Sequence, residues 1–210
     1  MQLSRIEEIL IPRRCVFCGT RRGLTGANMC EACLSDLPWQ RAVCKSDMLP
    51  FVAAVAPLEY SFPVDAALKA LKFKRRLDYV PPFAELLRRM LSELPDDIDA
   101  LLPVPLHWRR HAIRGFNQAV ELCERLRKQT GLPVVFGIKR VRSTPKQSGL
   151  DANERRRNLQ HAFAAGDPVD RRHVLIIDDV ITTGETCRQL AKVALAAGVE
   201  KVSVLAVARA

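Results

Sequence analysis

Continuous apolar runs alternate along the chain with stretches in which apolar residues recur at helical spacing. The clearest runs lie at 100–102, 174–177 and 202–207, and each is aliphatic throughout or nearly so. Such runs are typical of strands buried on both faces of a parallel sheet. The other predicted elements are a strand at 51–60, helices at 64–74, 83–94, 118–128 and 184–197, and a strand at 134–138. This alternation predicts an α/β fold, a parallel sheet flanked by helices.

The composition suits one such domain with a small appendage. The chain has 210 residues, of which 48% are hydrophobic, and this fraction is ample for a core. No apolar run approaches the roughly 20 residues that a membrane helix needs. The first residues carry acids and lack the apolar region of a signal peptide. We therefore expect a cytoplasmic protein without a membrane span.

Four cysteines near the N-terminus form two C-x₂-C pairs, Cys15 with Cys18 and Cys30 with Cys33. Each pair brings two thiolates to one metal, so the two pairs complete a tetrahedral Cys₄ zinc site. The turn-rich segment between them has too few apolar residues to fold alone, and zinc must supply the folding free energy. A closed Cys₄ shell is structural rather than catalytic. The alternative, a redox switch, is less favoured. We predict a zinc-knuckle module over 1–48 and the α/β domain over 49–210.

The other three cysteines give weaker signals. Cys44 is followed at the same spacing by Asp47 instead of a second cysteine. This pair fits either a degenerate second knuckle or a free thiol at Cys44, and we favour the free thiol. Cys123 and Cys187 lie on predicted helices and are expected to pack in the core.

One strand–turn–helix connection carries an unusual set of polar groups. The strand at 174–177 ends in Asp178 and Asp179, and a turn rich in threonine follows. Ligands of α/β sheets bind at the carboxyl ends of strands, and backbone N–H groups at a helix N-terminus bind anions. The acids suit sugar hydroxyls or a divalent cation, and the turn suits a phosphate. An ordinary capped connection is the alternative, although a cap needs only one Asp or Thr.

A second candidate anion site lies in a segment without acids between 100 and 120. A short strand leads into Pro103 and Pro105, and three arginines and two histidines then collect in a predicted loop before Asn117, which is placed to cap the next helix. An exposed basic loop is the alternative. The net charge of +10 also favours polyanions, although it would equally serve solubility. The basic run at 72–76 is expected to be a solvated helix end, and the less favoured alternative is that it contacts phosphate at the mouth of an anion site.

Three motifs in this order resemble a known family. The Asp-Asp-x₂-Thr-Thr-Gly pattern from Asp178 resembles the ribose-phosphate signature of type I phosphoribosyltransferases. The Pro-x-Pro-Leu-His and Arg-Gly-Phe-Asn-Gln-Ala stretches within 103–119, together with the Cys₄ element, resemble the ComF/GntX family of phosphoribosyltransferase-like proteins. The resemblance implies a type I phosphoribosyltransferase-like sheet, with phosphoribosyl diphosphate (PRPP) and Mg²⁺ as ligands.

The resemblance also implies residue roles. Asp178 and Asp179 bind the ribose hydroxyls, directly or through water on Mg²⁺, and act in catalysis with Arg114. The 5-phosphate is held by Thr182, Thr183, Gly184, Glu185 and Thr186, with Glu185 acting through its backbone and its side chain turned outward. The diphosphate side is formed by Leu106 through its backbone and by His107, Arg109 and Arg114.

Two features limit what the resemblance implies. Hypoxanthine/guanine transferases carry an Asp where this chain has Thr182, and a threonine cannot act as that base near neutral pH, so the acceptor stays unidentified. The segment at about 139–160 is basic, polar and broken by Pro145 and Gly149. It fits either a plain flexible loop or a mobile hood whose Lys146, Gln147 and Arg157 could reach the diphosphate.

The functional hypothesis is therefore a PRPP-binding, phosphoribosyltransferase-like protein linked to competence and DNA uptake or to nucleotide metabolism. The alternative is a non-catalytic accessory protein that senses PRPP or binds single-stranded nucleic acid. Candidate phosphate contacts for that alternative lie around the knuckle, at Arg13, Arg14, Arg21 and Arg22. The sequence does not indicate an oligomeric state.

Overall fold

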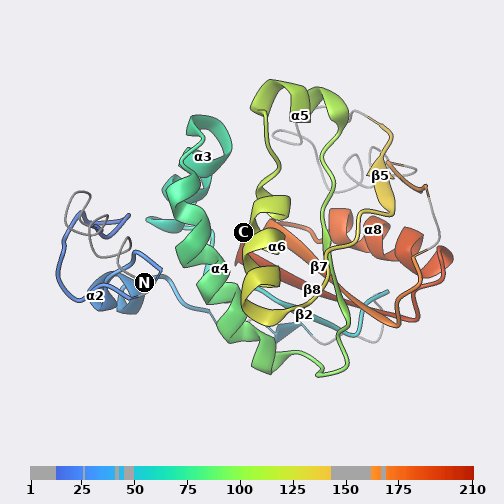
Figure 1. The fold of residues 1–210 in the computed structure, drawn as a ribbon, viewed down its shortest axis with the longest axis horizontal. Helices are drawn as coiled ribbons and strands as arrows, with labels where there is room; N and C mark the ends of the chain where they lie inside the picture. Colours follow the sequence, from blue (N-terminus) through green and yellow to red (C-terminus); the bar gives the residue numbers. More distant parts are fainter. Residues whose placement is uncertain (1–12, 26, 41–42, 45–49, 143–161, 167–168) are drawn as a thin grey trace, which may run out of the picture.

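The computed structural model describes residues 13–25, 27–40, 43–44, 50–142, 162–166 and 169–210 (Figure 1). A six-stranded sheet runs in the order β1-β2-β8-β7-β4, and β3 also pairs with β8. Every pairing is parallel except that of β1 with β2. The strands are β1 (Val43–Cys44), β2 (Ala53–Val55), β3 (Leu58–Glu59), β4 (Ala100–Pro103), β7 (His173–Ile181) and β8 (Lys201–Arg209). The predicted parallel sheet flanked by helices is confirmed.

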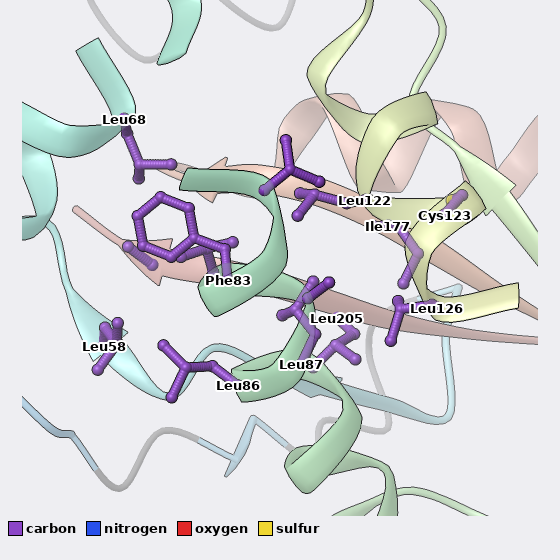
Figure 2. Packing of buried hydrophobic residues seen from close by; sticks show 14 of the residues in the cluster. Leu58, Leu68, Phe83, Leu86, Leu87, Leu122, Cys123, Leu126, Ile177 and Leu205 are labelled. Atoms are coloured by element: carbon purple, nitrogen blue, oxygen red, sulfur yellow. The ribbon is translucent and has the colours of Figure 1, made fainter. Parts of the chain in front are cut away.

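The middle parts of the central strands are mostly apolar because both faces of the sheet are covered. Leu175, Ile177 and Leu205 point to the face that packs against α3 (Val64–Lys74), α4 (Val80–Arg89) and α6 (Gln118–Thr130). Figure 2 shows this layer, in which Phe83, Leu87 and Leu122 meet the strands and are fully buried. Cys123 is buried in the same layer, as predicted.

The opposite face of the sheet packs against α8 (Glu185–Ala196). Val174, Ile176 and Val204 alternate with the residues of the first face, as the two-residue period of a strand requires. They meet Cys187 and Leu190 of α8, and all five side chains are buried, so the core prediction for Cys187 is also confirmed. A small antiparallel pair, β5 (Ile138–Arg140) with β6 (Phe163–Ala165), lies beside α8.

Several predicted boundaries differ from the structure. The predicted strand at 51–60 is divided into β2 and β3 around Pro57, which cannot donate to a sheet ladder. The predicted helix at 83–94 begins earlier, as α4, because Pro81 and Pro82 fit its first turn, and it ends in a 3₁₀ turn, η2 (Met90–Glu93). The basic segment predicted as a loop contains a short helix, α5 (Trp108–Arg114). Of the predicted strand at 134–138, Val134 forms one isolated bridge with Leu101, and Ile138 begins β5.

The N-terminal module is packed onto the α/β domain through an aromatic cluster. Phe17 lies between Cys15 and Cys18, and its ring centroid is 5.5 Å from that of Tyr79 and 6.3 Å from that of Phe83. The Tyr79 hydroxyl donates to the backbone carbonyl of Val16 at 3.3 Å. Tyr79 ends the turn η1 (Leu77–Tyr79), which links α3 to α4. The expected boundary at 48/49 is therefore crossed by a buried apolar contact.

A buried polar chain at the amino end of the central strands resembles a Ser-His-Asp triad but cannot act as one. His173 Nδ1 lies 2.5 Å from Asp97 Oδ1, and its Nε2 lies 2.9 Å from Ser203 Oγ. Ser203 and His173 are completely buried in the sheet, so no substrate reaches the hydroxyl. These hydrogen-bonded side chains link β7 to β8. Within the described residues, no helix is both long and apolar enough to cross a membrane.

Candidate anion-binding site and zinc ribbon

A polar pocket of about 630 Å³, counting its open mouth, lies at the carboxyl ends of β4 and β7. Open α/β sheets bind ligands at this edge. The side chains around it come from α3, α5, α6, β5 and the start of α8, elements that are far apart in sequence. Its polar lining residues are Lys72, Arg110, Arg114, Asn117, Gln118, Arg140, Asp178, Asp179 and Thr186.

The two adjacent acids lie at one wall of the pocket and differ in environment. Asp178 is partly buried, and burial together with the neighbouring Asp179 raises the pKa of its carboxyl well above the usual range. Its carboxylate accepts the backbone N–H of Asp179 at 2.8 Å. Asp179 is 8% exposed and forms an ion pair with Lys72. Both acids thus line the pocket, and Asp179 already has a cationic partner.

Lys72 is the residue of the basic run that enters the pocket. It lies in the last turn of α3, whereas Lys74 and Arg76 of the same run are exposed. Burial lowers the pKa of the Lys72 ammonium, but the nearby Asp179 outweighs this and leaves the pKa above its usual value. The prediction of a solvated helix end therefore holds for Lys74 and Arg76 and is wrong for Lys72.

Three guanidinium groups face the acids. Burial, together with the positive charge of Arg110, lowers the pKa of Arg140 to about 10. Burial and Arg110 also lower the pKa of Arg114, against the opposing effect of Asp179. The guanidinium groups are therefore close enough to influence one another, and they stand where an anionic ligand could contact them.

The predicted site residues are placed in two groups. Leu106, Arg114, Asp178, Asp179 and Thr186 line the pocket. Thr182, Thr183 and Gly184 instead line an adjoining, mainly apolar hollow of about 510 Å³.

The three remaining predicted residues, His107, Arg109 and Glu185, lie outside the lining of both hollows. His107 is buried, and its Nδ1 accepts the backbone N–H of Arg109 at 3.3 Å as the cap of α5. Burial and the charge of Arg109 lower the pKa of His107. The Arg109 guanidinium lies 5.2 Å from the centre of the Trp108 ring, so Arg110 occupies the place in the pocket that we expected for Arg109.

Two predicted features of the turns can be compared directly. Asn117 caps α6 as expected: its side chain accepts from Ala119 N at 3.0 Å and donates to Val104 O at 3.0 Å. The outward side chain expected for Glu185 is wrong, since it is 5% exposed and bonded to Arg188 and Gln189 within α8. Lys146, Gln147 and Arg157 lie outside the described residues.

Five polar residues of the pocket were not among the predicted site residues, namely Lys72, Arg110, Asn117, Gln118 and Arg140. Arg110 stands in the basic segment, but which arginines point inward depends on α5, which was predicted as loop. Arg140 lies in β5, and only the pairing with β6 brings it to the pocket. The Gln118 side chain is 3% exposed, and its Nε2 has no hydrogen-bond partner among the described residues.

The four predicted zinc ligands converge. The Sγ atoms of Cys15, Cys18, Cys30 and Cys33 all lie within 4.8 Å of one another, and those of Cys18 and Cys30 are 3.7 Å apart. Four sulfurs at about 2.3 Å from a tetrahedral zinc are about 3.8 Å apart, so the cluster fits this ion. Gly19, with φ +76°, closes the first knuckle.

The thiols of this cluster differ in their pKa values. Burial raises the pKa of Cys15, but hydrogen bonds from backbone groups, led by Cys18, lower it by more, to about 6. Burial and the neighbouring cysteines raise the pKa of Cys33. Zinc must therefore displace protons from the cluster, and its binding will weaken as the pH falls.

Comparison with known proteins identifies the relatives of this chain. It is 37% identical over 190 residues to the DNA utilization protein YhgH of Escherichia coli O157:H7, covering 86% of this chain and 77% of the relative. It is 35% identical over 163 residues to competence protein F of Haemophilus influenzae, covering 72% and 70%. The chain belongs to the ComF/GntX family. A further ComF relative, competence protein ComFC of Bacillus subtilis, is 28% identical over 140 residues.

The N-terminal part of this ComF/GntX member matches a family model described as a double zinc ribbon domain, over residues 6–58. The part of the chain that the structure describes contains one cluster of four cysteines. The matched range also includes Cys44 and Asp47, whose side chains lie outside the described residues. The prediction of a structural zinc site is supported, while that of a free Cys44 thiol stays a prediction.

Two solved structures resemble this ComF/GntX member in part. One is a glutamine PRPP amidotransferase from B. subtilis complexed with ADP and GMP, with a TM-score of 0.40 and 19% identity over 59% of this chain. The match spans 25% of that longer chain. The other is a purine phosphoribosyltransferase from Pyrococcus horikoshii, with a TM-score of 0.34 and 20% identity. The family assignment rests on the curated relatives.

Proposed function

We propose that this protein binds PRPP with Mg²⁺ and transfers its phosphoribosyl group to an acceptor. The observation that carries the proposal is the pocket itself, in which two adjacent acids face three arginines at the carboxyl edge of a parallel sheet. Carboxylates suit the ribose hydroxyls, and guanidinium groups bind phosphate oxygens in a bidentate manner. The curated relatives in DNA utilization and competence fit a role with nucleotides or nucleic acid.

The donor set also suits the cation that PRPP carries. Asp178 and Asp179 offer hard carboxylate oxygens, the ligands that Mg²⁺ prefers. Magnesium bound there with the ligand would neutralise charge that develops on the diphosphate. In the protein as described, Lys72 already partners Asp179. The acid pair can therefore bind a cation, either the Lys72 ammonium or Mg²⁺.

In the transfer step, the bond from C1 of the ribose to the diphosphate oxygen breaks. The diphosphate leaves with the bonding electron pair, and a nucleophilic atom of the acceptor bonds to C1 and loses a proton. Arg110, Arg114 and Arg140 would stabilise the charge that develops on the leaving diphosphate. Asp178 and Asp179 would hold the ring while its C1 becomes electron-poor.

PRPP binding and diphosphate release test this proposal. Calorimetry with Mg²⁺-PRPP is expected to give binding, and a mixture of nucleobases is expected to yield released diphosphate. Replacing Arg114 with Met should weaken PRPP binding at least about tenfold, since a charge-assisted bond is worth roughly 1.5–3 kcal/mol. Arg125→Met, an exposed change on α6, is the matched control and should have no effect. If the wild-type protein does not bind PRPP at millimolar concentration, the proposed function is wrong.

The second candidate, binding of single-stranded DNA, is favoured by the names of the relatives and by four exposed arginines on the zinc ribbon, Arg13, Arg14, Arg21 and Arg22. Affinity for an oligonucleotide should fall steeply with salt. Replacing Arg21 and Arg22 with Gln should flatten the logarithmic salt slope by about 0.7 for each lost phosphate contact. An unchanged slope would show that Arg21 and Arg22 do not contact DNA phosphates. A slope near zero in the wild type would rule out binding of single-stranded DNA.

A further inference from the structure

The ion pair between Lys72 and Asp179 joins the pocket to the end of α3, which the sequence favoured as a solvated helix end. Lys72 reaches Asp179 from the last turn of α3, and its side chain is 24% exposed. Asp179 is nine-tenths buried, at 8% exposure. A buried carboxylate needs a cationic partner, and Lys72 supplies it.

The same carboxylate is the group that a divalent cation would need. Magnesium binds carboxylate oxygens at about 2.0–2.1 Å, so an ammonium and a divalent ion in contact with one carboxylate would repel each other at close range. The pocket already carries Arg110, Arg114 and Arg140, which would add to that repulsion. A divalent ion alone therefore has to displace the Lys72 ammonium from Asp179.

An anionic ligand changes this balance. Phosphate oxygens in the pocket would offer the Lys72 ammonium a second partner, and its departure would leave Asp179 open to the cation. Lys72 lies on the pocket wall and carries its ammonium on a flexible four-carbon stem, which suits an exchange of one oxyanion for another. When the divalent cation leaves, the Lys72 ammonium would pair with Asp179 again.

We propose that Lys72 is the resident counter-ion of the acid pair, which excludes divalent cations from the empty site and passes to a ligand phosphate when cation and anion bind together. The cation and the anion then raise each other's affinity through one side chain. The identity of the anion, a diphosphate ester, rests on the proposed function. The competition between the Lys72 ammonium and a divalent cation for Asp179 is independent of that function.

Titration of Mn²⁺ followed by electron paramagnetic resonance tests the competition on the full zinc-loaded chain. Lys72→Met is expected to bind Mn²⁺ at least about tenfold more tightly than wild type with no anion present. The same variant should bind inorganic diphosphate at least about fivefold more weakly in buffer without divalent cations. Lys74→Met, an exposed change two residues along α3, should alter neither affinity.

The opposite signs of the two effects separate this role from damage to the fold, which would weaken both. Should Lys72→Met fail to fold because Asp179 loses its partner, Lys72→Gln keeps a hydrogen-bond donor without the charge and should show the same pair of shifts. Equal Mn²⁺ affinity in variant and wild type would overturn the inference, even with PRPP binding intact. Absence of PRPP binding with a tightened Mn²⁺ site would overturn only the proposed function.

Discussion

Removal of zinc is expected to lower the melting temperature by at least about 10 °C. The ribbon is short of apolar residues, so the metal supplies much of its folding free energy. Phe17, Met29 and Leu37 of the ribbon also pack on the core of the α/β domain. Loss of several kcal/mol corresponds to this shift, because a domain of this size loses about 2–4 °C per kcal/mol.

Cys33→Ser tests the zinc site within the chain, and chelation tests it from outside. Thermal unfolding followed by circular dichroism, with zinc measured by mass spectrometry, should show loss of the metal and of stability together. Cys44→Ser is the matched control, and it should keep one zinc per chain and the wild-type melting temperature if Cys44 is a free thiol. A chelated protein that melts as before would show that the ribbon does not depend on metal.

Replacing Asp178 with Asn is expected to weaken Mg²⁺-PRPP binding about a hundredfold or more and to make the stability of the protein fall less as the pH rises. Burial and Asp179 raise the pKa of this carboxyl in the folded state. A carboxyl whose folded pKa exceeds its unfolded pKa takes up protons on folding, so its contribution to stability falls as the pH rises from the unfolded pKa through the folded pKa. Above that window the full cost of the buried charge remains, and asparagine removes it.

The two readouts are the melting temperature between pH 4 and 8 and the affinity for Mg²⁺-PRPP. We expect a variant at least as stable as wild type at pH 8, a smaller fall in stability with rising pH, and binding weakened by about a hundredfold or more. Asp96→Asn, at an exposed carboxylate, should leave both unchanged. A variant that is less stable throughout would show that the Asp178 carboxylate supports the fold, against our assignment.

The local pattern of the chain was enough to predict the layers, because a strand covered on both faces is mostly apolar. That pattern located β7 and β8, but β7 continues past Asp178 and Asp179 to Ile181, so the acids lie in its C-terminal half and not at its end. Spacing alone also found the zinc ligands, since two C-x₂-C pairs have few other uses.

The inner wall of the pocket could not be predicted in the same way, because it is formed by contacts between elements distant in sequence. Lys72 and Asp179 are brought together by the packing of α3 against the sheet, and a basic run at a helix end usually faces solvent. Arg109 and Arg110 are neighbours with the same chemistry, and only the turn of α5 decides that Arg110 faces the acids. The buried Glu185 shows the same limit, as its partners lie in its own helix.

The contact between Tyr79 and the ribbon bears on any attempt to prepare a smaller fragment. Tyr79 stands between α3, which carries Lys72, and α4, and its hydroxyl is anchored to Val16 of the metal module. A shortened chain that begins after the cysteines would leave Phe83 without Phe17 and the α3–α4 link without its anchor. Ligand affinities measured on such a truncation would describe a loosened wall, and only the intact chain reports on the native site.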